Sequence, residues 1–112
     1  DYLALLQISS VHVYLTYPFV LSWSLLEAMA VGCAVVASRT APVEEVMRDG
    51  ENGSLVDFFD NEGLIDRVSQ ALADAEVARN LRLQARQTIV DRYDLESICL
   101  PRQVALFQEL LD

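Results

Sequence analysis

The sequence contains no lysine, one histidine and two cysteines. Its eight basic residues are all arginines and are outnumbered by 17 acidic residues, which gives a net charge of −9. Nucleic-acid backbones and anionic lipid head groups repel a surface of this charge. We therefore expect no nucleic-acid partner.

The few cysteines and the single histidine do not have the spacing of a metal site. Cys33 and Cys99 lie far apart in the chain, and His12 completes no usual zinc pattern with them. We expect two reduced, mostly buried thiols in a cytoplasmic protein, with no metal ion and no cofactor. Because His12 stands among apolar neighbours, we interpret it as a packed residue of a strand rather than as a catalyst.

Several catalytic and phosphate-binding motifs are also absent. The chain has no nucleophile elbow, no C-x-x-C pair, no Walker loop and no glycine-rich dinucleotide fingerprint. Charge is scarce in the first third, where Glu27 is the only formally charged residue between Asp1 and Arg39. A lone carboxylate in an apolar run is costly unless a partner satisfies it, so Glu27 requires an explanation.

An apolar run over residues 19–37 is about as long as a membrane span. Glu27 and Gly32 interrupt this run, and its last part has the composition of a buried strand. We therefore reject a transmembrane interpretation.

The bulk composition predicts one α/β domain with a real core. The chain has 112 residues, is 53% hydrophobic and has a mean hydropathy of +0.25. A domain of this size buries roughly two-thirds of its unfolded surface. The chain starts inside an expected helix, so we expect it to be a fragment of a longer protein.

Three short apolar runs, at residues 11–15, 34–37 and 54–56, predict parallel strands. Helices are predicted at residues 2–8, from Ser22 or Ser24 to residue 31, and at residues 43–48, 62–73, 77–92 and 95–111. Pro101 should kink or split the last of these. This order predicts half of a Rossmann-like doubly wound α/β sheet, about three parallel strands flanked by helices, followed by a helical C-terminal segment.

Ligands of open α/β sheets bind beyond the C-terminal ends of the strands. The helix that begins near Ser22 directs its N-terminus into this region, where free N–H groups favour an anion such as a diphosphate. Glu27, about one turn further along, could accept hydrogen bonds from ribose hydroxyls. Ser24 and Glu27 also match a capping box, in which the carboxylate accepts from the Ser24 N–H. The residues alone leave both alternatives open.

Other candidate residues have ordinary structural explanations beside functional ones. Trp23 could wall a base or sugar pocket, but we expect it in the core. Arg39 follows the second strand and could meet either a phosphate or the carboxylate of Glu44 or Glu45. The arginines of the second-to-last helix are expected to form a solvated face: Arg79, Arg82 and Arg86.

Three segments together carry a resemblance to a known family: LLEAMAVGCAVVAS at residues 25–38, PVEEV at 42–46 and DGENGSLV at 49–56. They resemble the C-terminal half of family 4 (group 1) retaining glycosyltransferases, which have the GT-B fold of two Rossmann-like domains facing across a cleft. The resemblance runs from about residue 2 to the end. It implies that residues 1–112 are the C-terminal part of the nucleotide-sugar-binding domain, with the N-terminal domain missing.

The resemblance implies transfer of a hexosyl group from a UDP-, GDP- or ADP-sugar to a saccharide, lipid or small-molecule acceptor, with retention of configuration. Reaction would occur on the front face without a bound metal, aided by electrostatic stabilisation of the leaving diphosphate. We assign no catalytic residue. Because the family's phosphate-binding Arg/Lys pair lies upstream, we expect the fragment alone to be inactive.

The resemblance also indicates which residues bind the donor. Glu27 matches the second glutamate of the family's E-x7-E motif, a ligand of the nucleotide ribose, and this favours the ligand role over the cap. Residues 20–24 correspond to the Gly-Phe-Gly-Leu segment, whose amides meet the diphosphate and sugar. The predicted donor-binding residues are Glu27, Ser22, Trp23, Ser24, Leu21 and Phe19.

Two departures from the family pattern bear on the sugar. Phe19 occupies the position of the first glutamate, and residues 20–24 contain no glycine. Phe19 cannot accept a hydrogen bond from a sugar hydroxyl, so we expect either altered sugar recognition, with Ser22 or Ser24 contributing, or a subgroup that uses a different donor.

The alternative function is that of a non-catalytic nucleotide-binding or scaffold module of GT-B ancestry.

The strand at residues 11–15 should have an exposed apolar edge. We expect a second copy of the fragment to cover this edge, by edge pairing or by exchange of the helix at residues 95–111.

Overall fold

The computed structural model describes residues 1–17 and 21–112. In this part of the chain, one sheet of three parallel strands has the order β1-β2-β3, and its elements match the three predicted runs. The strands are β1 (His12–Tyr14), β2 (Val35–Ser38) and β3 (Ser54–Val56). In register, His12 is opposite Val35 and Val36 is opposite Ser54.

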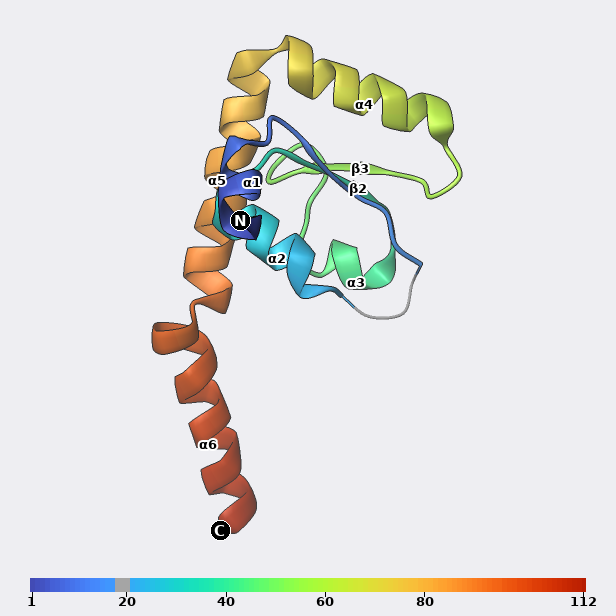
Figure 1. The fold of residues 1–112 in the computed structure, drawn as a ribbon. Coiled ribbons are helices and arrows are strands. Elements are labelled where there is room, and N and C mark those ends of the chain that lie inside the picture. Colours follow the sequence, from blue (N-terminus) through green and yellow to red (C-terminus); the bar gives the residue numbers. More distant parts are fainter. Residues whose placement is uncertain (18–20) are drawn as a thin grey trace.

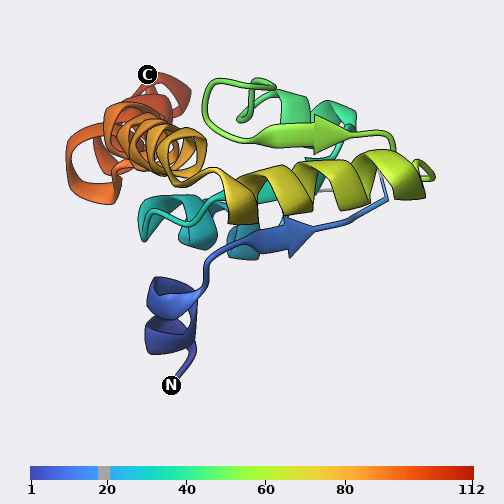
Figure 2. The same ribbon diagram turned by 90° about the horizontal axis from the view of Figure 1, so that it is seen from above.

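Helices cover both faces of this sheet, as the doubly wound prediction requires. They are α1 (Tyr2–Ile8), α2 (Trp23–Ala30), α3 (Ala41–Glu44), α4 (Asn61–Ala73), α5 (Ala75–Tyr93) and α6 (Leu100–Leu111), with a π-helical turn at Leu95–Cys99. α4 lies over one face of the sheet, while α2 and α3 lie on the other (Figures 1 and 2). α6 extends away from the body (Figure 1), which gives the molecule dimensions of 54 × 27 × 27 Å.

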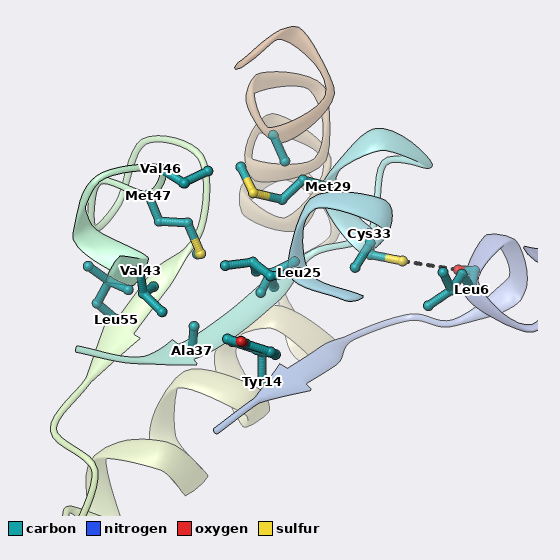
Figure 3. Packing of buried hydrophobic residues seen from close by; sticks show 13 residues of the cluster. Leu6, Tyr14, Leu25, Met29, Cys33, Ala37, Val43, Val46, Met47 and Leu55 are labelled. Atoms are coloured by element: carbon teal, nitrogen blue, oxygen red, sulfur yellow. Dashed lines mark hydrogen bonds between the residues drawn. The ribbon is translucent and has the colours of Figure 1, made fainter. Parts of the chain in front are cut away.

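The core lies between α2 and the sheet. Leu25 and Met29 of α2 are fully buried and pack with Ala37 of β2 and with residues of the segment that follows it (Figure 3). Every residue of β2 is buried, which is typical of a central parallel strand with helices on both faces. On the far side of α2, Ala85 of α5 is also fully buried.

Asn52 connects the turn before β3 to α5. Its buried side chain accepts a hydrogen bond from the Arg48 N–H at 2.8 Å and donates to the Val46 carbonyl and the Thr88 hydroxyl, each at 3.0 Å. The predicted turn over residues 49–53 is therefore fixed by a polar side chain that satisfies three buried groups. Gly50 has a φ of +80°, a left-handed conformation that favours glycine.

The helix predicted at residues 43–48 is shorter and begins earlier. α3 is a single turn with Pro42 in its first turn, where a missing N–H is not needed. The helix does not continue because the Arg48 N–H donates to Asn52 rather than to a helical carbonyl.

The helix predicted at residues 95–111 is split near Pro101, as expected: a π-helical turn over Leu95–Cys99 precedes α6, which begins one residue before Pro101. α5 ends before Asp94, whose carboxylate accepts from the Ser97 N–H at 2.9 Å and from the Ser97 hydroxyl at 2.7 Å. These hydrogen bonds hold the pKa of Asp94 below its ordinary value, and the bond from the Ser97 hydroxyl has the largest effect. Pro101 lies in the first turn of α6, which tolerates proline. Of the helices in the described residues, none combines the length and apolar character needed to cross a bilayer.

The prediction of a solvated arginine face on α5 is wrong for Arg82, which is half-buried, whereas Arg86 is exposed but also binds a backbone carbonyl. Arg82 donates to the Ser10 carbonyl at 2.6 Å, and Arg86 donates to the Ala30 carbonyl at the end of α2. The last carbonyls of a helix lack partners within the helix and attract cations, which explains the contact of Arg86. Arg79 is exposed, as predicted.

We predict that Asn52→Ala lowers the free energy of unfolding by about 2–4 kcal/mol, because it leaves buried groups around the turn without partners. Urea denaturation measures the change. Asn80→Ala, an exposed change on α5, is the control and should shift stability by less than about 0.5 kcal/mol. Equal effects of the two changes would contradict this role of Asn52.

Candidate functional site

The N-terminus of α2 lies at the edge of the sheet formed by the carboxyl ends of the strands. Ser22 is the N-cap, and its hydroxyl oxygen accepts from the Ser24 N–H at 3.2 Å and lies 3.0 Å from the Ser24 hydroxyl. Among the described residues, the Trp23 N–H has no hydrogen-bond acceptor. This helix end therefore presents an amide and two hydroxyls, a suitable environment for an anion.

Two side chains that the sequence did not single out position this end of α2. The buried Tyr14 phenol of β1 accepts from the Ser22 N–H at 3.0 Å. The fully buried Ser38 hydroxyl at the end of β2 accepts from the Thr16 N–H at 3.0 Å and lies 3.1 Å from the Thr16 carbonyl, to which it donates. The tyrosine in the strand predicted at residues 11–15 was the available signal, because a buried phenol needs a hydrogen-bond partner.

Glu27 lies about one turn into α2, and its side chain is exposed. The capping-box alternative is not formed, because the helix begins one residue after Ser22 and the Ser24 N–H donates to Ser22 instead. Partial desolvation, then the charge of Glu27 and a hydrogen bond with its side chain, raise the pKa of the Tyr2 phenol on α1. Glu27 thus faces solvent with the Tyr2 phenol beside it.

The expectation that Trp23 lies in the core is wrong. Its side chain is 81% exposed, because the first turn of α2 directs Leu25 toward the sheet and Trp23 away from it. Leu21, also a predicted donor-binding residue, is half-buried and packs against the core. Phe19 lies outside the described residues.

Arg39 is held by carboxylates. Its guanidinium lies 3.7 Å from Glu44 and 3.6 Å from Asp49. Asp49 also lies 3.2 Å from Arg67 and accepts from the Leu55 N–H at 3.0 Å. Of the two alternatives open for Arg39, the salt bridge to Glu44 is present, and a second acidic partner accompanies it.

His12 lies at the other end of β1, where its N–H donates to the Ala34 carbonyl at 2.8 Å. Its ring is half-buried, and desolvation lowers its pKa. It is therefore remote from the N-terminus of α2. In the described part of the chain, no three His, Cys, Asp or Glu side chains are grouped to hold a metal ion.

The sequence of this chain was compared with protein-family models and with curated proteins. The family model for glycosyl transferases group 1 matches residues 1–88. N-acetyl-alpha-D-glucosaminyl L-malate synthase of Bacillus anthracis is 32% identical over 88 residues, which cover 79% of this chain and 23% of the synthase.

Solved structures share the fold over nearly the whole chain. Sucrose-phosphate synthase from Thermosynechococcus elongatus superposes with a TM-score of 0.84 and 30% identity, over 98% of this chain and 28% of that protein. Anabaena HepE in complex with UDP-glucose superposes with a TM-score of 0.84 and 20% identity, over 94% of this chain and 29% of HepE.

The chain spans only 18–23% of the length of the curated relatives that it matches. Its three parallel strands with helices on both faces are those of a Rossmann-like C-terminal domain of the GT-B fold. With the family model matched over residues 1–88, this chain belongs to the group 1 glycosyltransferase family.

Proposed function

We propose that the full-length protein transfers a hexosyl group from a nucleotide-diphosphate sugar to an acceptor, with retention of configuration, and that this chain forms part of the donor site. The observation that carries the proposal is the exposed Glu27 carboxylate one turn beyond the N-terminus of α2, at the ligand-binding edge of the sheet. The fold shared with HepE, whose structure contains UDP-glucose, supports a nucleotide-sugar donor.

In this proposal, Glu27 accepts hydrogen bonds from the ribose hydroxyls. The diphosphate lies at the N-terminus of α2, where the Trp23 amide and the hydroxyls of Ser22 and Ser24 are available. Leu21, packed against the core, fixes the start of this segment. We assign Phe19 to the sugar side of the site on the basis of the resemblance alone.

The chemistry required of this chain is electrostatic. As the bond from the sugar to the diphosphate breaks, negative charge grows on the leaving oxygen. The N-terminus of α2 carries the positive end of the helix dipole and stabilises that charge. Because the Ser22 N–H at the start of α2 is already held by the Tyr14 phenol, little reorganisation is needed when the charge develops.

We further propose that the rest of the protein, including an N-terminal domain, supplies the acceptor site and the basic phosphate-binding residues. The acceptor is a saccharide, a lipid or a small molecule. The two free thiols, Cys33 and Cys99, support a cytoplasmic location, and the net charge of −9 argues against a nucleic-acid partner.

The alternative is a non-catalytic nucleotide-binding or scaffold module. The absence of a carboxylate at position 19 favours it, because a sugar hydroxyl then loses a charged acceptor. Calorimetry of the full-length protein with UDP, GDP and ADP tests the enzyme and the nucleotide-binding module, since each requires a nucleotide to bind, whereas a scaffold module requires none. Turnover of the corresponding nucleotide sugar then separates the enzyme from the module.

We predict that Glu27→Ala in the full-length protein lowers kcat/KM for the donor by about 10- to 100-fold, because a charge-assisted hydrogen bond to the ribose is lost. Its melting temperature should hardly change, because Glu27 caps nothing in the fold. Glu76→Ala, an exposed change in the first turn of α5, is the control and should leave kcat/KM unchanged. Parallel losses of activity and stability in Glu27→Ala would instead indicate a structural role.

We predict that the 112-residue chain produced alone has no transferase activity and associates with a second copy. The outer edge of β1 is unpaired in the described residues, Val13 and Leu15 are exposed beside it, and α6 is exposed along its whole length. Multi-angle light scattering should give about twice the mass of 12.5 kDa. A monomer in dilute solution, or turnover of a nucleotide sugar by this chain, would contradict the respective prediction.

A further inference from the structure

Three aromatic side chains meet at the carboxyl ends of the strands. Tyr17 follows β1, and Phe58 and Phe59 follow β3. The rings of Tyr17 and Phe58 are stacked, with centroids 4.7 Å apart and planes at 26°. Phe59 meets Phe58 edge to face, with centroids 4.9 Å apart and planes at 78°. We refer to these three residues as the aromatic cluster.

The aromatic cluster contributes little to the core. Phe59 is 83% exposed and Tyr17 is 57% exposed, so large ring faces remain in water. A single exposed aromatic side chain is ordinary, but rings that contact one another across two loops at the ligand-binding edge of a sheet form a surface suited to a ligand.

A hollow of about 310 Å³ is lined by Asp57 and Asp60, the residues on either side of the phenylalanine pair. Asp66, Arg39 and Arg67 also line it, and the two arginines are held by their ion pairs with Asp49. Asp60 also caps α4 by accepting from the Gly63 N–H, whereas Asp57 leaves its carboxylate toward solvent.

An aromatic face beside a carboxylate matches the chemistry of a pyranose ring. Such a ring has one face of C–H groups, whose slight positive charge is attracted to the negative face of an aromatic ring. Its rim of hydroxyls donates hydrogen bonds to carboxylates. An apolar protein segment on the same surface would bury the carboxylates of Asp57 and Asp60 without donors, which is costly.

We propose that the aromatic cluster and Asp57 form a binding site for a pyranose ring, with Phe59 stacking on the sugar face and Asp57 accepting from its hydroxyls. This inference rests on the proposed function and deepens it by adding a sugar subsite that does not involve Glu27. The ring belongs either to an acceptor saccharide or to the sugar of the donor.

The test is saturation-transfer NMR on the full-length protein with the methyl glycosides of glucose, galactose, mannose and N-acetylglucosamine. We expect at least one glycoside to bind, and Phe59→Leu to weaken it by about three- to tenfold, the range expected for loss of one aromatic contact. Phe59→Tyr keeps the ring face and should bind like the wild type. Leu83→Ala, which removes an exposed apolar side chain from α5, is the matched control and should also bind normally.

A second measurement identifies the source of the ring. Calorimetry compares UDP with UDP-glucose, GDP with GDP-glucose and ADP with ADP-glucose, in the wild type and in Phe59→Leu. If the ring is the donor's, Phe59→Leu weakens binding of the nucleotide sugar but not binding of the nucleoside diphosphate. If the ring is the acceptor's, Phe59→Leu weakens binding of the methyl glycoside only. Either result supports the subsite.

The subsite is overturned if the wild type and Phe59→Leu bind every sugar-containing probe equally, or if no methyl glycoside binds and the nucleotide sugars bind no differently in the two proteins. The aromatic cluster would then be a contact surface for another part of the protein. A protein that binds a methyl glycoside through Phe59 but binds no nucleoside diphosphate would contradict the proposed function and leave the sugar subsite intact.

Discussion

The position of α2 depends on contacts at both of its ends. At its start, the buried Tyr14 phenol accepts from the Ser22 N–H, and at its end Arg86 donates to the Ala30 carbonyl. Between these points, Leu25 and Met29 are fully buried against the sheet and α5. A helix of only eight residues has little stability of its own, so these contacts decide where it lies. The remainder of the candidate site follows from this placement.

Because one side of α2 is committed to the core, its other side faces away from the sheet. This explains why Trp23 and Glu27 are exposed although they stand in an apolar run of sequence. The carboxylate of Glu27 therefore incurs no burial cost. At the carboxyl ends of the strands, Asp57 and the aromatic cluster (Tyr17, Phe58 and Phe59) offer a different chemistry. One edge of the sheet thus carries both the helix end that we propose binds the diphosphate and the aromatic cluster that we propose binds a sugar.

Much of the fold could be predicted from the sequence, because strands and helices leave periodic patterns. The boundaries of α1 and β3 were predicted to the residue, and β2 within one. Long-range polar contacts leave no such pattern: the bonds of Arg82 and Arg86 to carbonyls of distant segments could not be predicted, and Trp23 was placed in the core from composition alone. Glu27 stands out because it is an isolated charge in an apolar run, and the structure adds that its side chain is exposed. The aromatic cluster was missed because its members lie about 40 residues apart and meet only when β1 and β3 join the same sheet.

The most direct test of the account is a crystal structure of the full-length protein with the nucleoside diphosphate that it binds. The account predicts a ribose hydroxyl within about 2.6–3.2 Å of a Glu27 carboxylate oxygen, and a phosphate oxygen at the Trp23 amide. A nucleotide bound elsewhere, with Glu27 still in solvent and the N-terminus of α2 without phosphate, would contradict it.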